Sequence, residues 1–299
     1  MSRWNRTHRT LTNSFCRPER YPIICAILRF CIPAHRAYRC RRIRRENTVH
    51  ITTDAIVLRE RAVDEFDSVL TLLSKERGII SAYARGARKP RAALRACAEL
   101  LSYSCFVLFE NRQKYTVDKA DLNRMFMGVR GDVEKLSLAS YFCQLTAEVA
   151  PHEENAEGYL RLLLNSLHLL DRDKRTCVFI KPVYELRLLT MAGFMPNLVG
   201  CCSCGNYEAE RMLFLPRLSQ IICGDCAPET LPENEIAVPL SKSVLAAMRH
   251  IIYADFGKLF GFTVSDETQQ NLNEITQHYV MVQLDKRFDT LDFYLAMRG

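Results

Sequence analysis

Five cysteines lie within 26 residues of one another, and four of them have the spacing of a metal site. They are Cys201, Cys202, Cys204, Cys223 and Cys226. The first and third form one C-x2-C pair, and the last two form a second pair after 18 residues. Each C-x2-C turn places two sulfur atoms on one side of a tight knuckle, so two knuckles can surround one ion. The alternative, a chance gathering of buried cysteines, does not explain this double spacing.

The donor set indicates which ion the site would take and for what purpose. Four thiolates suit structural Zn²⁺ or a single iron ion. Four protein ligands leave no position open for water, so catalysis at the metal is disfavoured. We expect one structural Zn²⁺ per chain. It would cross-link a module of about 30 residues that is too short to form a hydrophobic core of its own. Cys202 could compete with Cys201, but the C-x2-C geometry favours Cys201.

No set of residues with catalytic spacing is found. His152-Glu153-Glu154 nominally matches the H-x-E half of a zinc deaminase, but 46 residues separate it from Cys201 and neither cysteine pair follows a proline. The chain contains neither a G-x-x-x-x-G-K-[ST] loop nor a G-x-S-x-G elbow. We therefore predict no enzymatic activity and name no catalytic residue.

A strand-rich region precedes the elements that must position the cysteines. Short runs of alternating or β-branched residues occupy 51–60, 68–74, 79–88, 101–110 and 114–122. Gly78 closes a hairpin turn in the sequence KERG. Several short strands in about 75 residues predict a small closed or nearly closed β-barrel.

A cluster of cations lies between two of these strands, with no acidic residue among them. It consists of Arg85, Arg88, Lys89, Arg91 and Arg95. A solvated loop or helix start would explain the charges, and a surface that contacts phosphates would explain them equally well. If such a barrel binds a nucleic acid, four of its aromatic residues could stack on bases, although each suits a core position better: Tyr83, Tyr103, Phe106 and Tyr115.

From Asp132 onward the hydrophobic period becomes helical. Asp132, Ser241 and Ser265 have the character of N-cap residues. Gly193 should end a helix, and Pro182 inside that helix predicts a kink or a start. The last residues should pack back on the helices. The fold class is therefore α+β, in the order barrel, helices, cysteine module, helices.

Charge is distributed unevenly along the chain. Residues 1–49 carry twelve arginines and two acidic residues, a net charge of +10, whereas the remainder carries 29 basic and 32 acidic residues, a net charge of −3. An arginine-rich, acid-poor leader could bind a polyanion or target an organelle. We favour a disordered extension, or upstream sequence joined by a misplaced start near Val49.

Two further properties limit the class of protein. No run of about 18 apolar residues exists, so no membrane-spanning helix and no membrane partner are expected. Scattered single cysteines beside one dense cluster indicate a reducing cytosol and a metal site, not a disulfide framework.

Several stretches resemble RecO, a bacterial family of recombination mediators. The most specific is YELRLLTMAGFMPNLVGCCSCG followed by the second cysteine pair. TDAIVLRERAVDEFDSVLTLLSKERGIISAYARGARKPRA resembles the family's opening, and SYFCQLTAEVAP and FDTLDFY resemble its helical landmarks.

The resemblance implies an architecture. It predicts an N-terminal OB-fold over residues 50–128 and a helical domain made of residues 129–198 and 228–299. A zinc module, residues 199–227, interrupts that helical domain. The family has no counterpart of the leader, residues 1–49.

The resemblance also implies a function without enzymatic turnover. The family binds single- and double-stranded DNA, anneals complementary strands, and with RecR helps RecA to load on DNA coated by single-strand-binding protein, whose acidic C-terminal tail it contacts. It implies a cytoplasmic, nucleoid-associated bacterial protein. Its DNA-facing basic stretch matches the cations from Arg85 to Arg91, and its zinc ligands match the two cysteine pairs. The competing hypotheses are a protein–protein scaffold with minor DNA contact and an enzyme acting on nucleic acid.

One departure from the family pattern concerns the turn ahead of the second cysteine pair. The family often has Gly-Gly there, whereas this chain has Ser219-Gln220. We expect the hairpin turn of the zinc module to differ accordingly.

Overall fold

The structure is a computed structural model that describes residues 49–111, 114–227 and 235–298. The expectations for the arginine-rich leader fall, apart from Val49, outside the described residues. None of the helices in these ranges combines the length and the apolar character needed to cross a bilayer.

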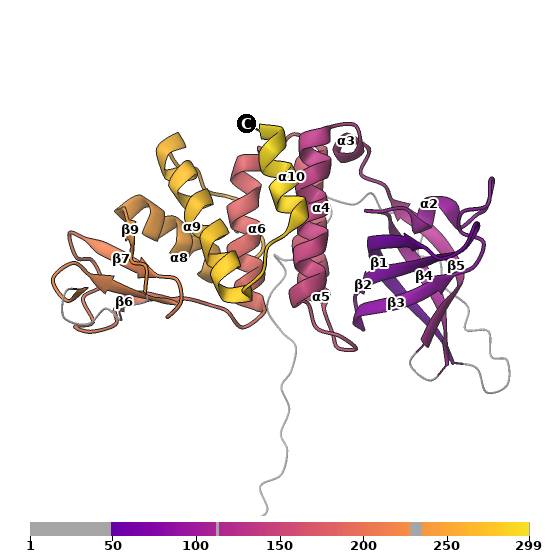
Figure 1. Ribbon diagram of the computed structural model, residues 1–299, viewed down its shortest axis with the longest axis horizontal. Helices are drawn as coiled ribbons and strands as arrows, with labels where there is room; N and C mark the ends of the chain where they lie inside the picture. The colour runs from indigo at the N-terminus through magenta and orange to yellow at the C-terminus, as the bar shows by residue number, and fades with distance from the viewer. Residues whose placement is uncertain (1–48, 112–113, 228–234, 299) are drawn as a thin grey trace, which may run out of the picture. The chain divides into compact units, whose positions relative to one another are not determined.

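The first part of the described chain is a closed five-stranded barrel. Its strands are β1 Val49–Ala62, β2 Ser68–Ser74, β3 Gly78–Ala84, β4 Tyr103–Asn111 and β5 Lys114–Arg124. They follow one another around the barrel in the order β1-β2-β3-β5-β4, with β4 returning to β1 (Figure 1). All neighbours are antiparallel except β3 and β5, which are parallel. This is the OB-type barrel that the sequence predicts.

Alternation along the strands fills the barrel. Leu70, Leu72, Phe106 and Leu108 point inward and are fully buried, because every second residue of a strand faces the same side. The short helix α2, Arg95–Ala98, follows the basic stretch, so those cations lie on a loop that ends in one helical turn.

The loop that follows α4 docks against the turn between β2 and β3. Gly78 has a φ of +60°, and a Cβ atom there would lie 2.0 Å from the Pro151 carbonyl oxygen, so only glycine fits. The backbone N–H of Ile79 donates to that oxygen at 2.9 Å. The barrel and the helical domain are therefore joined by backbone contacts at this turn, and His152 beside it is exposed.

Seven helices of four or more residues follow the barrel among the described residues. They are α3 Met127–Arg130, α4 Val133–Val149, α5 Glu157–Asp171, α6 Cys177–Met191, α8 Lys242–Tyr253, α9 Asp266–Leu284 and α10 Asp289–Arg298. The side chains of Asp132, Ser241 and Ser265 accept the capping N–H bonds of α4, α8 and α9, as the sequence predicts. The C-terminal α10 packs on α4 (Figure 1).

Helix α6 runs through Pro182, which corrects one expectation. The helix begins at Cys177, capped by Thr176, so Pro182 is not its start. Proline cannot donate to the carbonyl four residues before it, which is that of Val178. The side-chain amides of Gln269 and Asn273 on α9 donate to this carbonyl at 2.9 and 2.8 Å. The neighbouring helix thus supplies the hydrogen bonds that the proline removes.

A buried ion pair lies inside the helical domain. The Lys181 ammonium is 2.9 Å from the Glu185 carboxylate, with the two side chains 1% and 0% exposed. The hydroxyl groups of Tyr141 and Thr276 donate to the two oxygens of Glu185 at 2.8 and 2.7 Å. Helices α4, α6 and α9 therefore meet at a carboxylate whose two oxygens are both hydrogen-bonded.

The cysteine module is a four-stranded sheet. Its strands are β6 Asn197–Cys201, β7 Met212–Leu215, β8 Gln220–Cys223 and β9 Val238–Leu240, in the order β6-β8-β7-β9. Helix α9 holds its hairpin, because Tyr279 donates to the Ser219 hydroxyl at 2.9 Å and Gln283 donates to the Pro216 carbonyl at 2.6 Å.

Candidate metal centre and nucleic-acid interface

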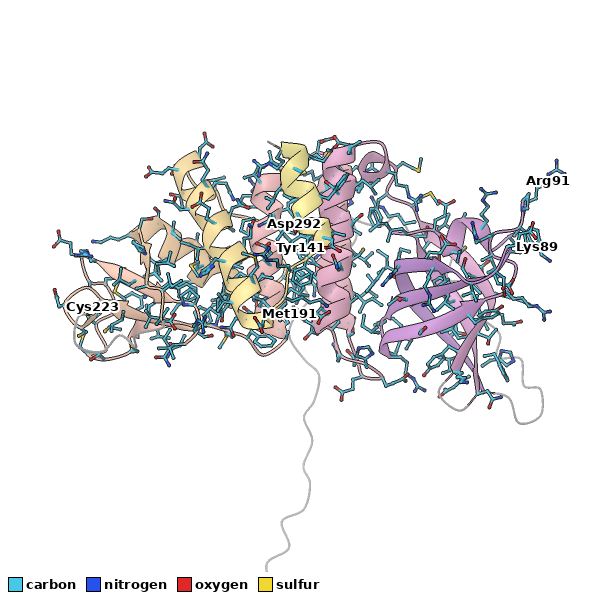
Figure 2. All side chains as sticks on the ribbon, viewed as in Figure 1. Lys89, Arg91, Tyr141, Met191, Cys223 and Asp292 are labelled. Atoms are coloured by element: carbon cyan, nitrogen blue, oxygen red, sulfur yellow. The ribbon has the colours of Figure 1, made fainter. Side chains whose placement is uncertain are left out.

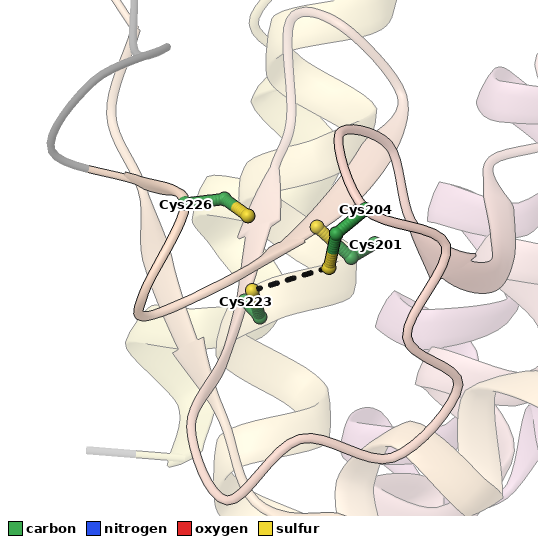
Figure 3. Close-up of side chains that lie close together, drawn as sticks. All are labelled: Cys201, Cys204, Cys223 and Cys226. Atoms are coloured by element: carbon green, nitrogen blue, oxygen red, sulfur yellow. Dashed lines mark hydrogen bonds between the residues drawn. The ribbon is translucent and has the colours of Figure 1, made fainter.

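The fold brings the two cysteine pairs together. The sulfur atoms of Cys201, Cys204, Cys223 and Cys226 all lie within 4.8 Å of one another (Figure 3). Cys201 ends β6 and Cys223 ends β8, and these strands are neighbours in the sheet. The β7–β8 hairpin spans most of the interval between the pairs. Cys202 is exposed and does not belong to this cluster.

Glycines allow the first knuckle to close. Gly205 has a φ of +74° and donates its N–H to the Cys201 carbonyl at 2.9 Å. A Cβ atom at Gly200 would lie 2.8 Å from the Gly205 carbonyl oxygen, so the backbone approaches too closely for a side chain. The knuckle therefore depends on glycine at both positions.

Arg249 on α8 fixes the same knuckle to the helices. Its guanidinium donates to the carbonyls of Leu198, Val199 and Tyr207 at 2.8 to 3.0 Å. It also lies over the Tyr207 ring, 3.9 Å from the ring centre. A side chain of helix α8 thus fixes the backbone on both sides of the first cysteine pair.

The thiols of the cluster differ in acidity. Burial raises the pKa of Cys201, but backbone hydrogen bonds from Cys204 and Cys223 outweigh it, and the pKa is lowered to about 6. The hydrogen bond with Cys223 raises the pKa of Cys226 to about 12. The Cys201 thiol is therefore largely ionised near neutral pH, whereas the Cys226 thiol keeps its proton unless a cation replaces it.

The geometry fits a tetrahedral metal ion. Four sulfur atoms bound at about 2.3 Å to one zinc ion lie about 3.8 Å from each other. The Cys204 and Cys223 sulfur atoms are 3.8 Å apart (Figure 3). The cluster could therefore hold a metal ion through four thiolates, and such a set leaves no position for a bound substrate.

The turn between β7 and β8 contains Ser219-Gln220, the residues that depart from the family pattern. Ser219 has a φ of +54°, a backbone conformation that glycine adopts more readily. Its hydroxyl accepts the hydrogen bond from Tyr279. The serine therefore makes a contact that glycine could not make, in a strained conformation.

The five predicted DNA-binding cations are all exposed. Arg85, Arg88, Lys89 and Arg91 follow β3 and Arg95 begins α2; residues 85–95 are hereafter the basic loop. In the part of the chain that the structure describes, none of them forms an ion pair with a carboxylate. Lys89 and Arg91 project from the barrel (Figure 2). Their charges are thus available to a ligand, and their role remains a prediction.

The four aromatic candidates differ in position. Phe106 and Tyr115 are buried in the barrel core, and Tyr103 is half-buried against the helical domain. Only Tyr83 is both partly exposed and close to the basic loop. Burial in the core therefore removes Phe106 and Tyr115 as stacking surfaces.

The structure adds residues that the sequence did not single out. Phe66, in the β1–β2 turn, is 37% exposed, and the Lys89 ammonium lies 5.8 Å from its ring centre. Arg61 pairs across the sheet with Val69, which pairs with Tyr83, so Arg61 and Tyr83 share the outer face. The acidic segment AVDEFD separates β1 from β2, so the sequence alone does not show that Arg61 and Tyr83 lie on the same face.

Comparison with protein families assigns a class. The model described as "Recombination protein O N terminal" matches residues 49–126, and the model described as "Recombination protein O C terminal" matches residues 130–292. The barrel and the cysteine-bearing helical domain are therefore those of a recombination protein.

Individual relatives of this chain support the same assignment. DNA repair protein RecO of Acetivibrio thermocellus is 34% identical over 244 residues, which cover 82% of this chain and 96% of the relative. DNA repair protein RecO of Alkaliphilus metalliredigens is 30% identical over 243 residues, covering 81% and 97%. The chain belongs to the RecO family, which gives it a role in DNA repair and recombination.

Proposed function

We propose that this protein is a recombination mediator that binds single- and double-stranded DNA with its basic loop and anneals complementary strands. The observation that carries the proposal is a loop of five exposed cations, free of ion pairs with described carboxylates, beside an exposed aromatic ring at Phe66. OB-type barrels hold single strands through a cationic surface and aromatic stacking.

The physical basis is neutralisation of phosphate charge. Each arginine or lysine that contacts a phosphate releases counterions, so the affinity should fall steeply with salt. Annealing needs no bond to be made or broken. It needs only that two polyanions are held close together with their repulsion reduced.

The proposed partners come from the family. We propose that the protein acts with RecR, contacts the acidic tail of single-strand-binding protein, and so helps RecA to load. It would act in the bacterial cytoplasm at the nucleoid, as a binding protein and not as an enzyme.

The cysteine cluster has a structural role in this proposal. Zn²⁺ bound by Cys201, Cys204, Cys223 and Cys226 would tie β6 to β8. The sulfur distances and the four-thiolate donor set support zinc. The metal would supply structural cross-linking, because four thiolates fill its coordination.

The test is a charge reversal in the basic loop. Arg88→Glu with Arg91→Glu should weaken binding to a short single strand. Each phosphate-binding cation contributes about 0.7 to the slope of log affinity against log salt, so removing two of them should flatten that slope by about 1.4. Electrophoretic mobility shifts over a salt series measure both quantities.

The controls separate this loop from other cations. Lys242→Glu with Arg287→Glu makes the same charge change at exposed positions outside the barrel. A chain beginning at His50 removes the arginine-rich leader. Unchanged binding by the basic-loop variant in that shortened chain would contradict the proposal.

A second function, a protein–protein scaffold, is favoured by apolar residues around the cysteine module. Met195, Val199, Leu218 and Ile236 are all exposed. If partner binding is the main function, charge reversal in the basic loop leaves partner binding intact and DNA binding is weak at low salt even in the unaltered protein.

A further inference from the structure

We propose that Asp67 is the positioning residue of the DNA-binding surface: its carboxylate latches the basic loop to the β1–β2 turn. This inference rests on the proposed function, because it takes the basic loop to be the part of the protein that binds DNA. Asp67 itself need not touch DNA.

Both carboxylate oxygens of Asp67 accept hydrogen bonds, one from strand β3 and one from the basic loop that follows it. Oδ2 accepts a hydrogen bond from the Tyr83 hydroxyl near the end of β3. Oδ1 accepts the backbone N–H of Gly86 at 2.7 Å, in the first turn of the loop. Arg85 lies between these two anchored residues. One side chain therefore fixes the point at which the loop leaves the barrel.

Neighbouring contacts continue the attachment. The backbone N–H of Arg88 donates to the Phe66 carbonyl at 3.0 Å, and its guanidinium donates to the Asp64 carbonyl at 3.3 Å. The Ala87 side chain is buried in the barrel core. The loop is thus attached to the turn at residues 86 to 88, and the exposed Phe66 ring is brought beside Lys89.

The carboxylate is suited to remain ionised in this position. The hydrogen bond from Tyr83, followed by that from Gly86, lowers the pKa of Asp67, and the nearby Arg85 and Lys89 act in the same direction. Hydrogen bonds to an ionised acceptor are stronger than those between neutral groups. The latch should therefore hold at neutral pH.

Two physical effects predict opposite signs for removing Asp67. A negative charge beside a polyanion-binding surface repels the ligand, so its removal alone should tighten binding. A latch orders the cations before the strand arrives, so its removal should weaken binding because the loop must then be ordered on association. The sign of the change distinguishes a bystander from a positioning residue.

The experiment compares Asp67→Ala with Asp64→Ala in the full-length protein, using a short oligothymidine strand. Both variants remove one acidic charge from the same turn. Asp64 is exposed and forms hydrogen bonds here through backbone groups, its carbonyl with Arg88 and its N–H with the Asp67 carbonyl, and alanine retains both. Tyr83→Phe is the third variant, because it removes one donor of the latch without changing charge.

We expect Asp67→Ala to lower the affinity about five- to tenfold, because two hydrogen bonds that order the loop are removed. Tyr83→Phe should lower it about twofold to threefold. Asp64→Ala should leave the affinity unchanged or raise it about twofold. The salt slope should become shallower for Asp67→Ala by about 0.7 for each phosphate that the loop no longer binds.

Limited trypsin digestion reports the order of the loop directly. Cleavage after Arg85, Arg88, Arg91 and Arg95, identified by mass spectrometry, should be faster in Asp67→Ala than in Asp64→Ala. Equal or tighter DNA binding by Asp67→Ala overturns the inference, as does weaker binding with unchanged cleavage in the loop. If Asp67→Ala does not fold, Tyr83→Phe decides: unchanged binding and cleavage overturn the inference.

These experiments distinguish a failure of the inference about Asp67 from a failure of the proposed DNA-binding function. If the basic loop does not contact DNA, Arg88→Glu with Arg91→Glu leaves binding unchanged, whatever Asp67 does. If the loop contacts DNA but Asp67 is a bystander, that double variant weakens binding while Asp67→Ala behaves like Asp64→Ala.

Discussion

Two polar clusters lie in the second half of the described chain, and they differ in how the charge of their acidic groups is balanced. The Lys181–Glu185 cluster contains its own counterion, and the hydroxyl groups of Tyr141 and Thr276 satisfy the same carboxylate. Tyr141 lies within the helices (Figure 2). The cysteine cluster gathers four thiol sulfur atoms within 4.8 Å of one another, and none of its four members is a basic side chain.

The difference shows two ways of placing polar groups where a core would otherwise be apolar. A buried pair with its hydrogen bonds satisfied is stable on its own, although replacing both partners by apolar groups often costs little. Four thiols can all ionise only when a metal compensates their charge. The first cluster should therefore be insensitive to chelators, and the second should depend on metal.

The largest expected effect comes from removing one sulfur ligand. Cys223→Ser should abolish stoichiometric zinc and destabilise the module by about 5 kcal/mol or more, because structural zinc contributes its binding energy to folding. Zinc content by atomic emission and thermal unfolding measure the change. Cys202→Ser is the matched control and should keep one zinc ion per chain. Equal zinc in the two variants would contradict the proposed ligand set.

Breaking the buried ion pair should have the next largest effect. Glu185→Gln leaves the Lys181 ammonium buried without its partner and should cost about 3 to 5 kcal/mol in the free energy of unfolding. Adding Lys181→Met should recover at least half of that loss, since the unpaired charge is removed. Urea unfolding of both variants provides the measurement, and zinc content should stay unchanged in each. Additive losses would show that the pair does not act as a unit.

The zinc affinity of the cysteine cluster should depend on pH. The pKa of Cys226 is raised to about 12, so metal binding must displace its proton, whereas Cys201, with a pKa of about 6, is largely ionised at pH 7. Zinc affinity should therefore rise with pH, about tenfold per pH unit for each proton released. Competition with a chromogenic chelator between pH 6 and pH 8 tests the sign. A pH-independent affinity would show that the thiols ionise without metal.

The smallest expected effect concerns the hairpin turn of the cysteine module. Ser219→Ala keeps the φ of +54° and loses the hydrogen bond with Tyr279, so it should cost about 1 kcal/mol. Ser219→Gly loses the same bond but relieves the strained backbone, so the net change should be about zero. Urea unfolding distinguishes the two. A larger loss for glycine than for alanine would mean that the turn is not strained.

Much of the fold could be predicted from local signals in the sequence. Asp132, Ser241 and Ser265 indicate helix starts because capping is decided within four residues. Gly193, with a φ of +93°, ends α6 as expected. The cysteine spacing was sufficient to predict which four sulfur atoms would gather.

The remaining features depend on contacts between distant residues. Lys181 and Glu185 resemble an ordinary surface pair on a helix, and their burial depends partly on Thr276, 91 residues after Glu185. Pro182 suggested a kink or a helix start, and the sequence does not show that the donors that compensate it come from α9. Asp67 belongs to an acidic turn whose contact with the basic loop appears only when β1, β2 and β3 pair.

Helix α9 has a consequence for how the protein unfolds. Its polar residues Gln269, Asn273, Thr276, Tyr279 and Gln283 recur every three or four positions, and so follow one side of the helix. The first two satisfy the carbonyl exposed by the proline of α6, the third joins the buried ion pair, and the last two hold the cysteine hairpin. The cysteine sheet and the helices should therefore melt as a single cooperative body, so that a loss of stability at either polar cluster lowers the unfolding temperature of both, while the folded protein with a broken ion pair keeps its metal.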